Sequence, residues 1–382
     1  MLSLLLALHT AHAEPLPACE LSEGAWLLTM SPGTDVQTIF GHTAVLLYDP
    51  GQGEFSPVYD YGRFDVEALP KMAWEVLTMT KPYYVASRQL AEVRATYDRK
   101  GRGVTAQRLD LSPAQLGTFS GALTTDLNAD LVFPYNWYRP NCTTMVLDRI
   151  DDAVGGRVKA ELSGLSGISP AGEVLRHSGD HLPLWLGLRW GSGAFAHRPV
   201  DHYSASFLPD RLASSLEQVR HPGGRPLVGP RCQLASVAPA TVPAEGPQRH
   251  PLMIFLGALW ASVLVGTARA HRGAGRALVA LHGLAVGLWG SAALLVGSLG
   301  TFAPFWGHHN LTVASPLTLG LIGAAWWSPR TEGRGPQAIA AALAALALVG
   351  LGTALLGNHN LGLVLGLGLP LGAMVWALRP AP

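Results

Sequence analysis

Apolar residues in the first third of the chain fall into short runs separated by turn residues, which is the pattern of β-strands. The runs are rich in Val, Leu, Tyr and Thr, and Pro-Gly, Asp-Pro-Gly and Gly-x-Gly sequences lie between them. Asp49-Pro50-Gly51 predicts a hairpin between two of the runs. Five strands are predicted, over residues 25–30, 42–48, 57–64, 83–89 and 104–111.

After residue 111 the apolar residues change to a helical spacing. Ser112-Pro113 suits the N-cap and the first position of a helix. A second helix is predicted to start near Cys142, behind an Asn141 cap, and residues 155–234 are expected to add short helices. The pattern therefore predicts an α+β fold, in which a small antiparallel sheet packs against helices.

The last third of the chain is apolar and follows a Pro- and Ala-rich linker at residues 235–250. Gly, Ala and Leu dominate it, as close packing of helices in lipid allows. Each apolar segment approaches the ~20 residues that cross a bilayer. Five transmembrane helices are predicted, over residues 251–268, 277–299, 312–328, 337–356 and 361–378.

Charge supports this division of the chain. Only 14% of the residues are charged, against about a quarter in ordinary soluble domains, so a wholly soluble protein is excluded. No basic patch that could bind nucleic acid is present. Arg residues gather in the loops 269–276 and 329–336, whereas the loops 300–311 and 357–360 have no Lys or Arg. The positive-inside rule places the Arg-bearing loops in the cytoplasm and residues 14–250 on the outer side.

The N-terminus also predicts export. A short apolar run ends at Ala11-His12-Ala13, an A-x-A cleavage pattern, so residues 1–13 are expected to be a signal peptide. The chain has three cysteines, and an odd number in an exported protein predicts one disulfide and one free thiol. Cys19 and Cys232 lie near the two ends of the predicted outer domain and are expected to pair, which leaves Cys142 free.

The candidate chemistry centres on Cys142. A cysteine in the first turn of a helix is favoured as a thiolate by the helix dipole and by unpaired backbone N–H groups, and the same N–H groups can hold an oxyanion. His42, which follows Gly41 at the start of a predicted strand, suits the role of base. Asp60, on the strand after the hairpin, is predicted to orient the His42 ring. The alternative is that Cys142 is a buried structural cysteine.

The remaining histidines give a weaker signal. His177 and His181 could share a helix face, and His197, Asp201 and His202 are close in sequence. Neither group has the spacing of a metal site, so solvated or capping histidines are the alternative. No metal and no other cofactor is predicted.

The order of these motifs along the chain resembles that of known protein families. A His on a strand followed by Asn-Cys at a helix start resembles a circularly permuted papain-like domain, as in NlpC-type peptidases and the lecithin:retinol acyltransferase family. More closely, the chain resembles the lipoprotein N-acyltransferase B (Lnb) family over about residues 25–212. The matching motifs are Ser31-Pro32-Gly33, Phe40–Ala44, Tyr59–Asp65, Tyr135-Asn136, Asn141–Thr144 and Phe207–Asp210. The resemblance implies Asn where this chain has Asp60.

The resemblance implies an acyltransferase of the bacterial inner membrane, multi-pass, with its catalytic domain (residues 14–234) in the periplasm and residues 251–382 in the membrane. Cys142 would take a fatty acyl chain from a phospholipid as a thioester and pass it to the N-terminal amine of a diacylglyceryl-cysteine lipoprotein. Tyr135, Asn136 and Asn141 would bind substrate. The alternatives are a membrane-tethered cysteine peptidase or amidase that acts on cell-wall peptides, and a non-catalytic receptor.

Two similar polar turns interrupt the apolar third, fifty positions apart, at 307–311 and 357–361. Neutral His and Asn can bond a lipid ester or phosphate without the cost of a buried charge. We therefore expect His308, His309, Asn310 and His359 to line the lipid side of the site. The alternative is that they are ordinary turn residues at the bilayer surface.

Overall fold

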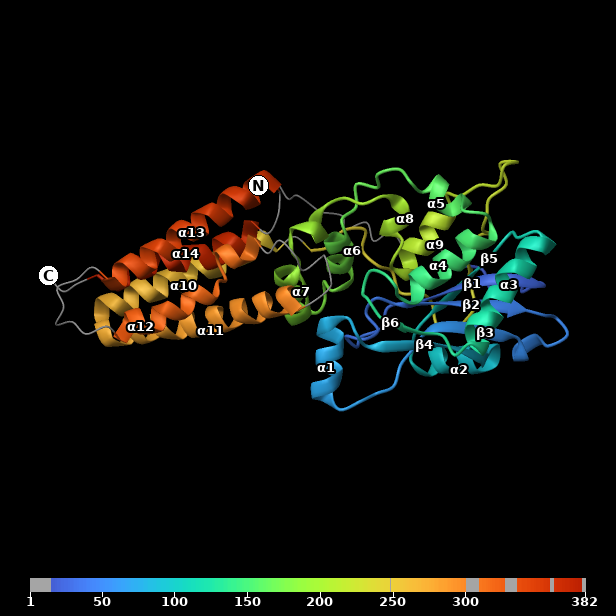
Figure 1. Cartoon of the computed structure of the whole chain (residues 1–382), viewed down its shortest axis with the longest axis horizontal. Coiled ribbons are helices and arrows are strands. Elements are labelled where there is room, and N and C mark those ends of the chain that lie inside the picture. The colour runs from blue at the N-terminus through green and yellow to red at the C-terminus, as the bar shows by residue number, and fades with distance from the viewer. Residues whose placement is uncertain (1–14, 248, 300–308, 327–334, 358–360, 380–382) are drawn as a thin grey trace, which may run out of the picture.

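The computed structural model describes residues 15–247, 249–299, 309–326, 335–357 and 361–379. Two parts lie end to end along the long axis of the molecule (Figure 1). One part contains a β-sheet with helices around it and is called the sheet domain (residues 15–247). The other consists of apolar helices and is called the helical region (residues 249–379). The predicted signal peptide lies outside the described residues.

One antiparallel sheet organises the sheet domain, with strand order β6-β4-β3-β2-β1-β5-β7. The five strands predicted from sequence are confirmed to within a few residues, and the short edge strands β6 and β7 were not predicted. The strands are β1 (Gly24–Met30), β2 (His42–Tyr48), β3 (Pro57–Arg63), β4 (Pro82–Gln89), β5 (Val104–Arg108), β6 (Val132–Pro134) and β7 (Cys232–Gln233). The predicted hairpin joins β2 to β3, and the 3₁₀ turn η1 (Gly53–Phe55) lies within it.

Both faces of the sheet are covered by helices. Alternate residues of β1 and β2, such as Leu27 and Val45, belong to a core shared with α3, α4 and α9, whereas Leu28 and Leu46 belong to a core shared with α2. The central strands are therefore apolar on both faces rather than alternating. The helices are α1 (Leu69–Thr78), α2 (Leu90–Arg99), α3 (Pro113–Asn128), α4 (Cys142–Ala153), α5 (Arg157–Glu161), α6 (Pro170–His177), α7 (Leu182–Gly191), α8 (His202–Ala205) and α9 (Pro209–Leu216), with the 3₁₀ turn η2 (Ala194–His197).

The helix starts predicted from sequence are confirmed. The Ser112 side chain accepts from the backbone N–H of Gln115, and the Gln115 side chain accepts from the Ser112 N–H, so α3 begins with a capping box. Helices α1 and α2 were not predicted, because they lie among segments with a strand pattern. The α+β class with an antiparallel sheet is confirmed, whereas the permuted papain-like arrangement stays a prediction.

A disulfide closes the sheet domain. Cys19 is bonded to Cys232 of β7, their Cα atoms are 4.9 Å apart, and Cys142 is the free, buried cysteine. The predicted pairing is therefore confirmed. The bond joins segments 213 residues apart, so it restricts the unfolded chain strongly.

Replacing both Cys19 and Cys232 with serine is expected to lower the free energy of unfolding by about 2–4 kcal/mol, because the unfolded chain regains the freedom that the cross-link removes. Thermal unfolding of the full chain in detergent measures this, with Cys142→Ala as the variant that keeps the bond. Non-reducing peptide maps should show Cys19 joined to Cys232, and a bond to Cys142 in the native protein would contradict the assignment.

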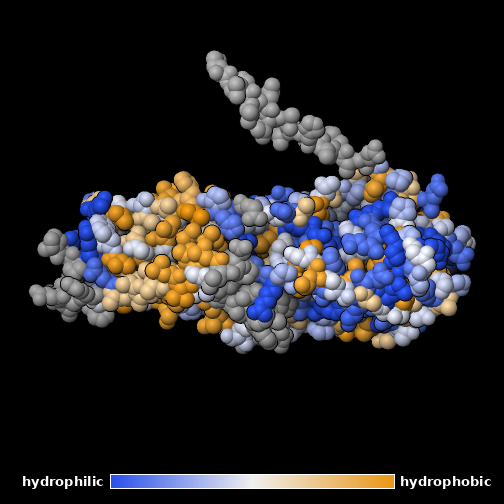
Figure 2. Space-filling view, turned by 90° about the horizontal axis from the view of Figure 1, so that it is seen from above, coloured by the Kyte–Doolittle hydropathy of each residue, from blue (hydrophilic) through white to orange (hydrophobic). Residues whose placement is uncertain are grey.

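Among the described residues of the helical region, three helices are long and apolar enough to cross a membrane, over His250–Ala270, Arg272–Leu295 and Gly335–Leu355. Hydrophobic side chains gather over this end of the molecule in Figure 2. The backbones of α10 and α14 pack closely, since a Cβ added at Gly257 would clash with Gly366. The described elements are α10 (His250–Ala270), α11 (Arg272–Leu299), η4 (His309–Thr312), η5 (Pro316–Leu319), α12 (Gly320–Trp326), α13 (Gly335–Gly357) and α14 (Leu361–Ala377).

The predicted span over residues 312–328 differs from the structure. Its described part is two 3₁₀ turns and the seven-residue helix α12. The break lies at Ser315-Pro316, where the Ser315 hydroxyl caps a new turn and Pro316 has no N–H to continue an earlier helix. The last predicted span forms α14, which has 17 residues and contains Pro370. A bundle of five spanning helices is therefore not confirmed.

Helix α7 of the sheet domain packs against the helical region. The ring of Trp190, near its end, packs edge-on against Trp289 of α11, with ring centroids 5.2 Å apart. Asn310 Nδ2 donates to the Trp190 carbonyl at 2.8 Å, and Asn310 is only 1% exposed. Asn310 thus holds the helical region to α7, which differs from the expected lipid-facing side chain. His308 and His359 lie outside the described residues, as does the His309 side chain.

Candidate active site

The free cysteine is the first residue of α4. Asn141 is the N-cap, and its Oδ1 accepts from the backbone N–H groups of Thr143 and Thr144. Its Nδ2 donates to the Phe207 carbonyl at 3.1 Å, which ties the start of α4 to the segment before α9. Cys142 is 7% exposed and lies at the positive end of the helix dipole. The predicted helix start and cap are confirmed.

His42 begins β2 and faces Asp60 on the neighbouring strand β3. His42 Nε2 donates to Asp60 Oδ1 at 2.8 Å. Asp60 is 3% exposed, and Oδ1 also accepts from the Gly62 N–H. The charges of His42 and of Cys142 act on one another. The structure therefore brings the three predicted residues together in one cluster, in which His42 is bonded to Asp60 and interacts electrostatically with Cys142.

Electrostatics favour charge separation in this cluster. Burial opposes the charged imidazole, but Asp60 and Cys142 outweigh it and raise the pKa of His42 well above its ordinary value. Burial likewise opposes the thiolate, but His42 and the backbone N–H of Thr43 lower the pKa of Cys142. For Asp60, His42 and the Gly62 N–H overcome burial and lower the pKa to about 2. A thiolate–imidazolium pair next to a carboxylate is the arrangement of an activated cysteine.

Two glycines near His42 occupy positions where a Cβ would not fit. Gly41 has φ +75°, and a Cβ there would lie 2.7 Å from the Met30 carbonyl oxygen. A Cβ at Gly62 would clash with Cε1 of His42 and lie 3.1 Å from Nδ1. The role of Gly62 depends on the pairing of two strands and could not be read from spacing.

Gly62→Ala is expected to push the His42 ring away from Asp60 and to slow alkylation of Cys142 by iodoacetamide at pH 7 by roughly tenfold, which corresponds to one unit of thiol pKa. The rate of carbamidomethylation, followed by mass spectrometry, measures this effect. Gly121→Ala is the matched control, because no atom lies within 4 Å of a Cβ at that position of α3. Equal rates in both variants would contradict the contact.

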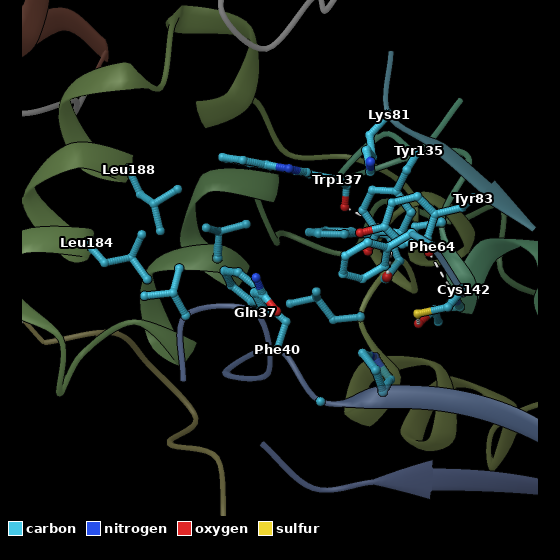
Figure 3. Close-up of a pocket in the computed structure, with 18 residues that line it drawn as sticks. Gln37, Phe40, Phe64, Lys81, Tyr83, Tyr135, Trp137, Cys142, Leu184 and Leu188 are labelled. Carbon is cyan, nitrogen blue, oxygen red and sulfur yellow. Dashed lines mark hydrogen bonds between the residues drawn. The ribbon is translucent and has the colours of Figure 1, made fainter. Parts of the chain in front are cut away.

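A cavity of about 210 Å³ begins at Cys142 and is mostly apolar. In Figure 3, Cys142 lies at one end, Leu184 and Leu188 of α7 lie at the other, and aromatic rings line the space between. Lys81 also lines it and is 2% exposed; its Nζ lies 3.2 Å from Glu75 Oε2 and 3.4 Å from Glu67 Oε2. The lining residues are Val36, Gln37, Phe40, Gly41, Phe64, Lys81, Tyr83, Tyr135, Trp137, Asn141, Cys142, Thr143, Val174, Leu184, Leu188, Phe207, Leu208 and Pro209.

The residues expected to bind substrate have different positions. Tyr135 lines the cavity beside Cys142, and its ring stacks on Tyr83 with the ring centroids 4.1 Å apart. Asn136 Oδ1 accepts from the backbone N–H groups of Tyr138 and Arg139, so Asn136 shapes the turn before α4. The amide of Asn141 is engaged at the helix start, so Asn141 positions Cys142.

The other histidines do not form the groups considered from sequence. Helix α6 ends at His177 and α7 begins after His181, so the two do not share a helix face. The break follows from Ser178-Gly179 and from Pro183 at the start of α7. His177 instead contacts the Ile39 carbonyl through Nδ1 and Asp210 through Nε2. Among the described residues, no group of three or more His, Cys, Asp or Glu side chains is placed to hold a metal.

Sequence reasoning missed Phe64, Lys81, Tyr83 and the α7 leucines. Tyr83 belongs to a predicted strand, and Phe64 lies at the end of another within a motif already noted, so these two had a signal. Leu184 and Leu188 had none, because α7 reaches the cavity through tertiary packing with the segment around Phe207 and Leu208.

The fold and the site define a class: a protein with apolar helices of membrane-spanning length and a sheet domain that carries a buried Cys–His–Asp cluster beside an apolar cavity. Residues 19–174 match the family described as the Lnb N-terminal periplasmic domain. This match supports the resemblance to the Lnb family, and with the apolar helices it indicates a membrane protein with a periplasmic domain. Neither a search of curated proteins nor one of solved structures finds a match.

Proposed function

We propose that this protein is a thiol-dependent acyltransferase that modifies bacterial lipoproteins. A fatty acyl chain would move from a phospholipid to Cys142 and then to the N-terminal amine of a diacylglyceryl-cysteine. The observation that carries the proposal is the cluster of Cys142, His42 and Asp60 at the end of an apolar cavity, in which His42 is bonded to Asp60 and lowers the pKa of Cys142. The match of residues 19–174 to the Lnb N-terminal periplasmic domain supports it.

In the first step, the Cys142 thiolate attacks the ester carbonyl carbon of the phospholipid. The C–O bond breaks, the leaving alkoxide takes the proton from His42, and a thioester and a lysophospholipid remain. Asn141 already accepts from the N–H groups of Thr143 and Thr144, so the proposal assigns the developing oxyanion to the N–H of Cys142 itself. Since His42 Nε2 is bonded to Asp60, the proton moves through Nδ1.

In the second step, the neutral amine of the lipoprotein attacks the thioester carbonyl. An amide C–N bond forms, the C–S bond breaks, and His42 accepts the proton that the amine loses. Asp60 holds the ring in the same orientation through both steps. Dividing one ester-to-amide exchange in this way replaces a slow step by two faster ones.

The cavity favours an acyl substrate over the peptide of the alternative reading. Its walls are mainly Phe, Leu, Val, Tyr and Trp side chains. A peptide there would leave buried N–H and C=O groups unpaired, at a cost of several kcal/mol, whereas an acyl chain has no such groups. The helical region would keep the site at the bilayer surface, where both lipid substrates are found.

The proposal also includes an arrangement in the membrane. Residues 1–13 would be a signal peptide, residues 14–234 the periplasmic catalytic domain, residues 235–250 a linker and residues 251–382 the multi-pass inner-membrane part. The Arg-bearing loops would face the cytoplasm.

The test is the mass of Cys142 in protein purified from membranes without a thiol reductant. We expect a peptide with a fatty acyl adduct on Cys142 that neutral hydroxylamine removes, as it removes thioesters. Adding a diacylglyceryl-cysteine peptide should discharge the adduct and yield an N-acylated peptide. Cleavage of cell-wall peptides with no acyl adduct under any donor would contradict the proposal and support the peptidase.

A further inference from the structure

Helix α7 forms the end of the cavity opposite Cys142 (Figure 3). Leu184 and Leu188 lie one helical turn apart on this helix and line the cavity. Leu188 is 9% exposed and packs in a cluster with Phe207 and Leu208, which also line the cavity. The far wall is therefore the body of a packed helix.

The helix that forms this wall is held in place from both sides. Trp185 of α7 is 2% exposed in the same cluster, and Trp190 is fixed by Trp289 and by the bond from Asn310. Met253 of α10 packs against this cluster as well. A wall that is packed against two parts of the molecule cannot recede easily, so it limits what the cavity accommodates.

We propose that the cavity binds one linear acyl chain with its terminal methyl group against α7, and that Leu184 and Leu188 set the greatest chain length that Cys142 accepts. This inference rests on the proposed acyl transfer. Both leucines lie beyond residue 174, where the family match ends.

The size of the effect follows from methylene burial, since each buried CH₂ group strengthens binding about fourfold. Phe has three more side-chain carbons than Leu, so Leu→Phe at this end takes the space of two or three methylenes. Binding of the longest chains should therefore weaken roughly 15- to 60-fold relative to binding of chains too short to reach α7.

The first experiment measures chain selection. Full-length protein is incubated with equimolar phosphatidylethanolamines bearing C10, C12 and C16 chains in mixed detergent micelles, and the acyl adducts on Cys142 are quantified by mass. We expect Leu188→Phe and Leu184→Phe to lower the C16:C10 ratio of adducts at least tenfold. Leu182→Phe is the matched control: it lies on the same helix, is 42% exposed and does not line the cavity.

Leu184 is less buried than Leu188, so Leu184→Phe keeps the test available if Leu188→Phe does not fold. An unchanged C16:C10 ratio in a folded Leu184→Phe variant would overturn the inference.

The second experiment does not need acyl transfer. In the reaction with an alkyl methanethiosulfonate, the Cys142 thiolate attacks the sulfenyl sulfur, a mixed disulfide forms and methanesulfinate leaves. Butyl and hexadecyl reagents are compared. For each variant we take the ratio of the hexadecyl rate to the butyl rate, and we divide the ratio for Leu184→Phe by the ratio for Leu182→Phe. Partition of the reagents into micelles is the same for both variants, so it cancels. The hexadecyl reagent should be selectively slowed, at least tenfold.

The two experiments separate the two claims. Selective slowing of the hexadecyl reagent without any phospholipid adduct in the native protein would contradict the proposed function and keep the chain-binding cavity. Phospholipid adducts with equal hexadecyl and butyl effects and an unchanged C16:C10 ratio would overturn the cavity assignment and keep the acyltransferase.

Discussion

Cys142→Ala is expected to abolish acyl transfer, with a loss of roughly a thousandfold or more, because no neighbouring group replaces the sulfur as the atom that carries the acyl chain. His42 and Asp60 retain their bond in this variant, so the fold should persist. N-acylation of a synthetic diacylglyceryl-cysteine peptide in phospholipid micelles measures the effect.

Cys142→Ser is the informative companion variant. Its hydroxyl occupies the same place at the start of α4, but its pKa lies far above that of a thiol, so little alkoxide forms beside His42. We expect very low transfer here too, without a hydroxylamine-sensitive adduct. Transfer at the native rate in Cys142→Ala, with the Cys19–Cys232 bond intact, would remove Cys142 from the mechanism.

His42→Ala is expected to change the pH dependence of Cys142. In the native protein His42 lowers the pKa of Cys142, so the thiolate survives as the pH falls below the ordinary thiol value of about 8.5. Without His42, burial dominates and raises the pKa of Cys142, so the midpoint of alkylation moves to higher pH. At pH 7 the rate should fall at least tenfold.

Iodoacetamide profiles between pH 5 and 10 measure this shift, with His202→Ala on α8 as the control. The native profile should also show a loss of reactivity at low pH as the thiolate accepts a proton. A His42→Ala profile that coincides with the native one would mean that Cys142 is not coupled to the imidazole.

Local rules were sufficient for the residues that form the candidate site. Asn141 caps a helix by contacts within three residues, and His42 begins a strand that its own Val and Leu residues define. The neighbouring strand then brings Asp60 to His42, because the hairpin turn between them fixes the pairing. Turn chemistry, capping and strand period are all legible in one sequence.

Long-range packing decided the remaining features. Asn310 was expected to line the lipid side of the site, but it is buried and its amide donates to the carbonyl of Trp190 in the sheet domain. The segment over 312–328 is apolar enough for a membrane span, but hydropathy does not take into account the helix break at Ser315-Pro316. No pattern in α7 indicates that Leu184 and Leu188 face a cavity shared with Cys142.

Helix α7 makes the membrane part more than a tether. Trp190 of α7 packs against Trp289 and accepts a hydrogen bond from Asn310. A chain cut after the sheet domain would keep Cys142, His42 and Asp60 together, but α7 would lose these two contacts and the cavity wall their support. Replacing the helical region with one unrelated membrane helix should therefore leave a reactive thiol that no longer distinguishes long chains from short ones. The helical region would thus be needed both to hold the protein in the membrane and to select the length of the acyl chain.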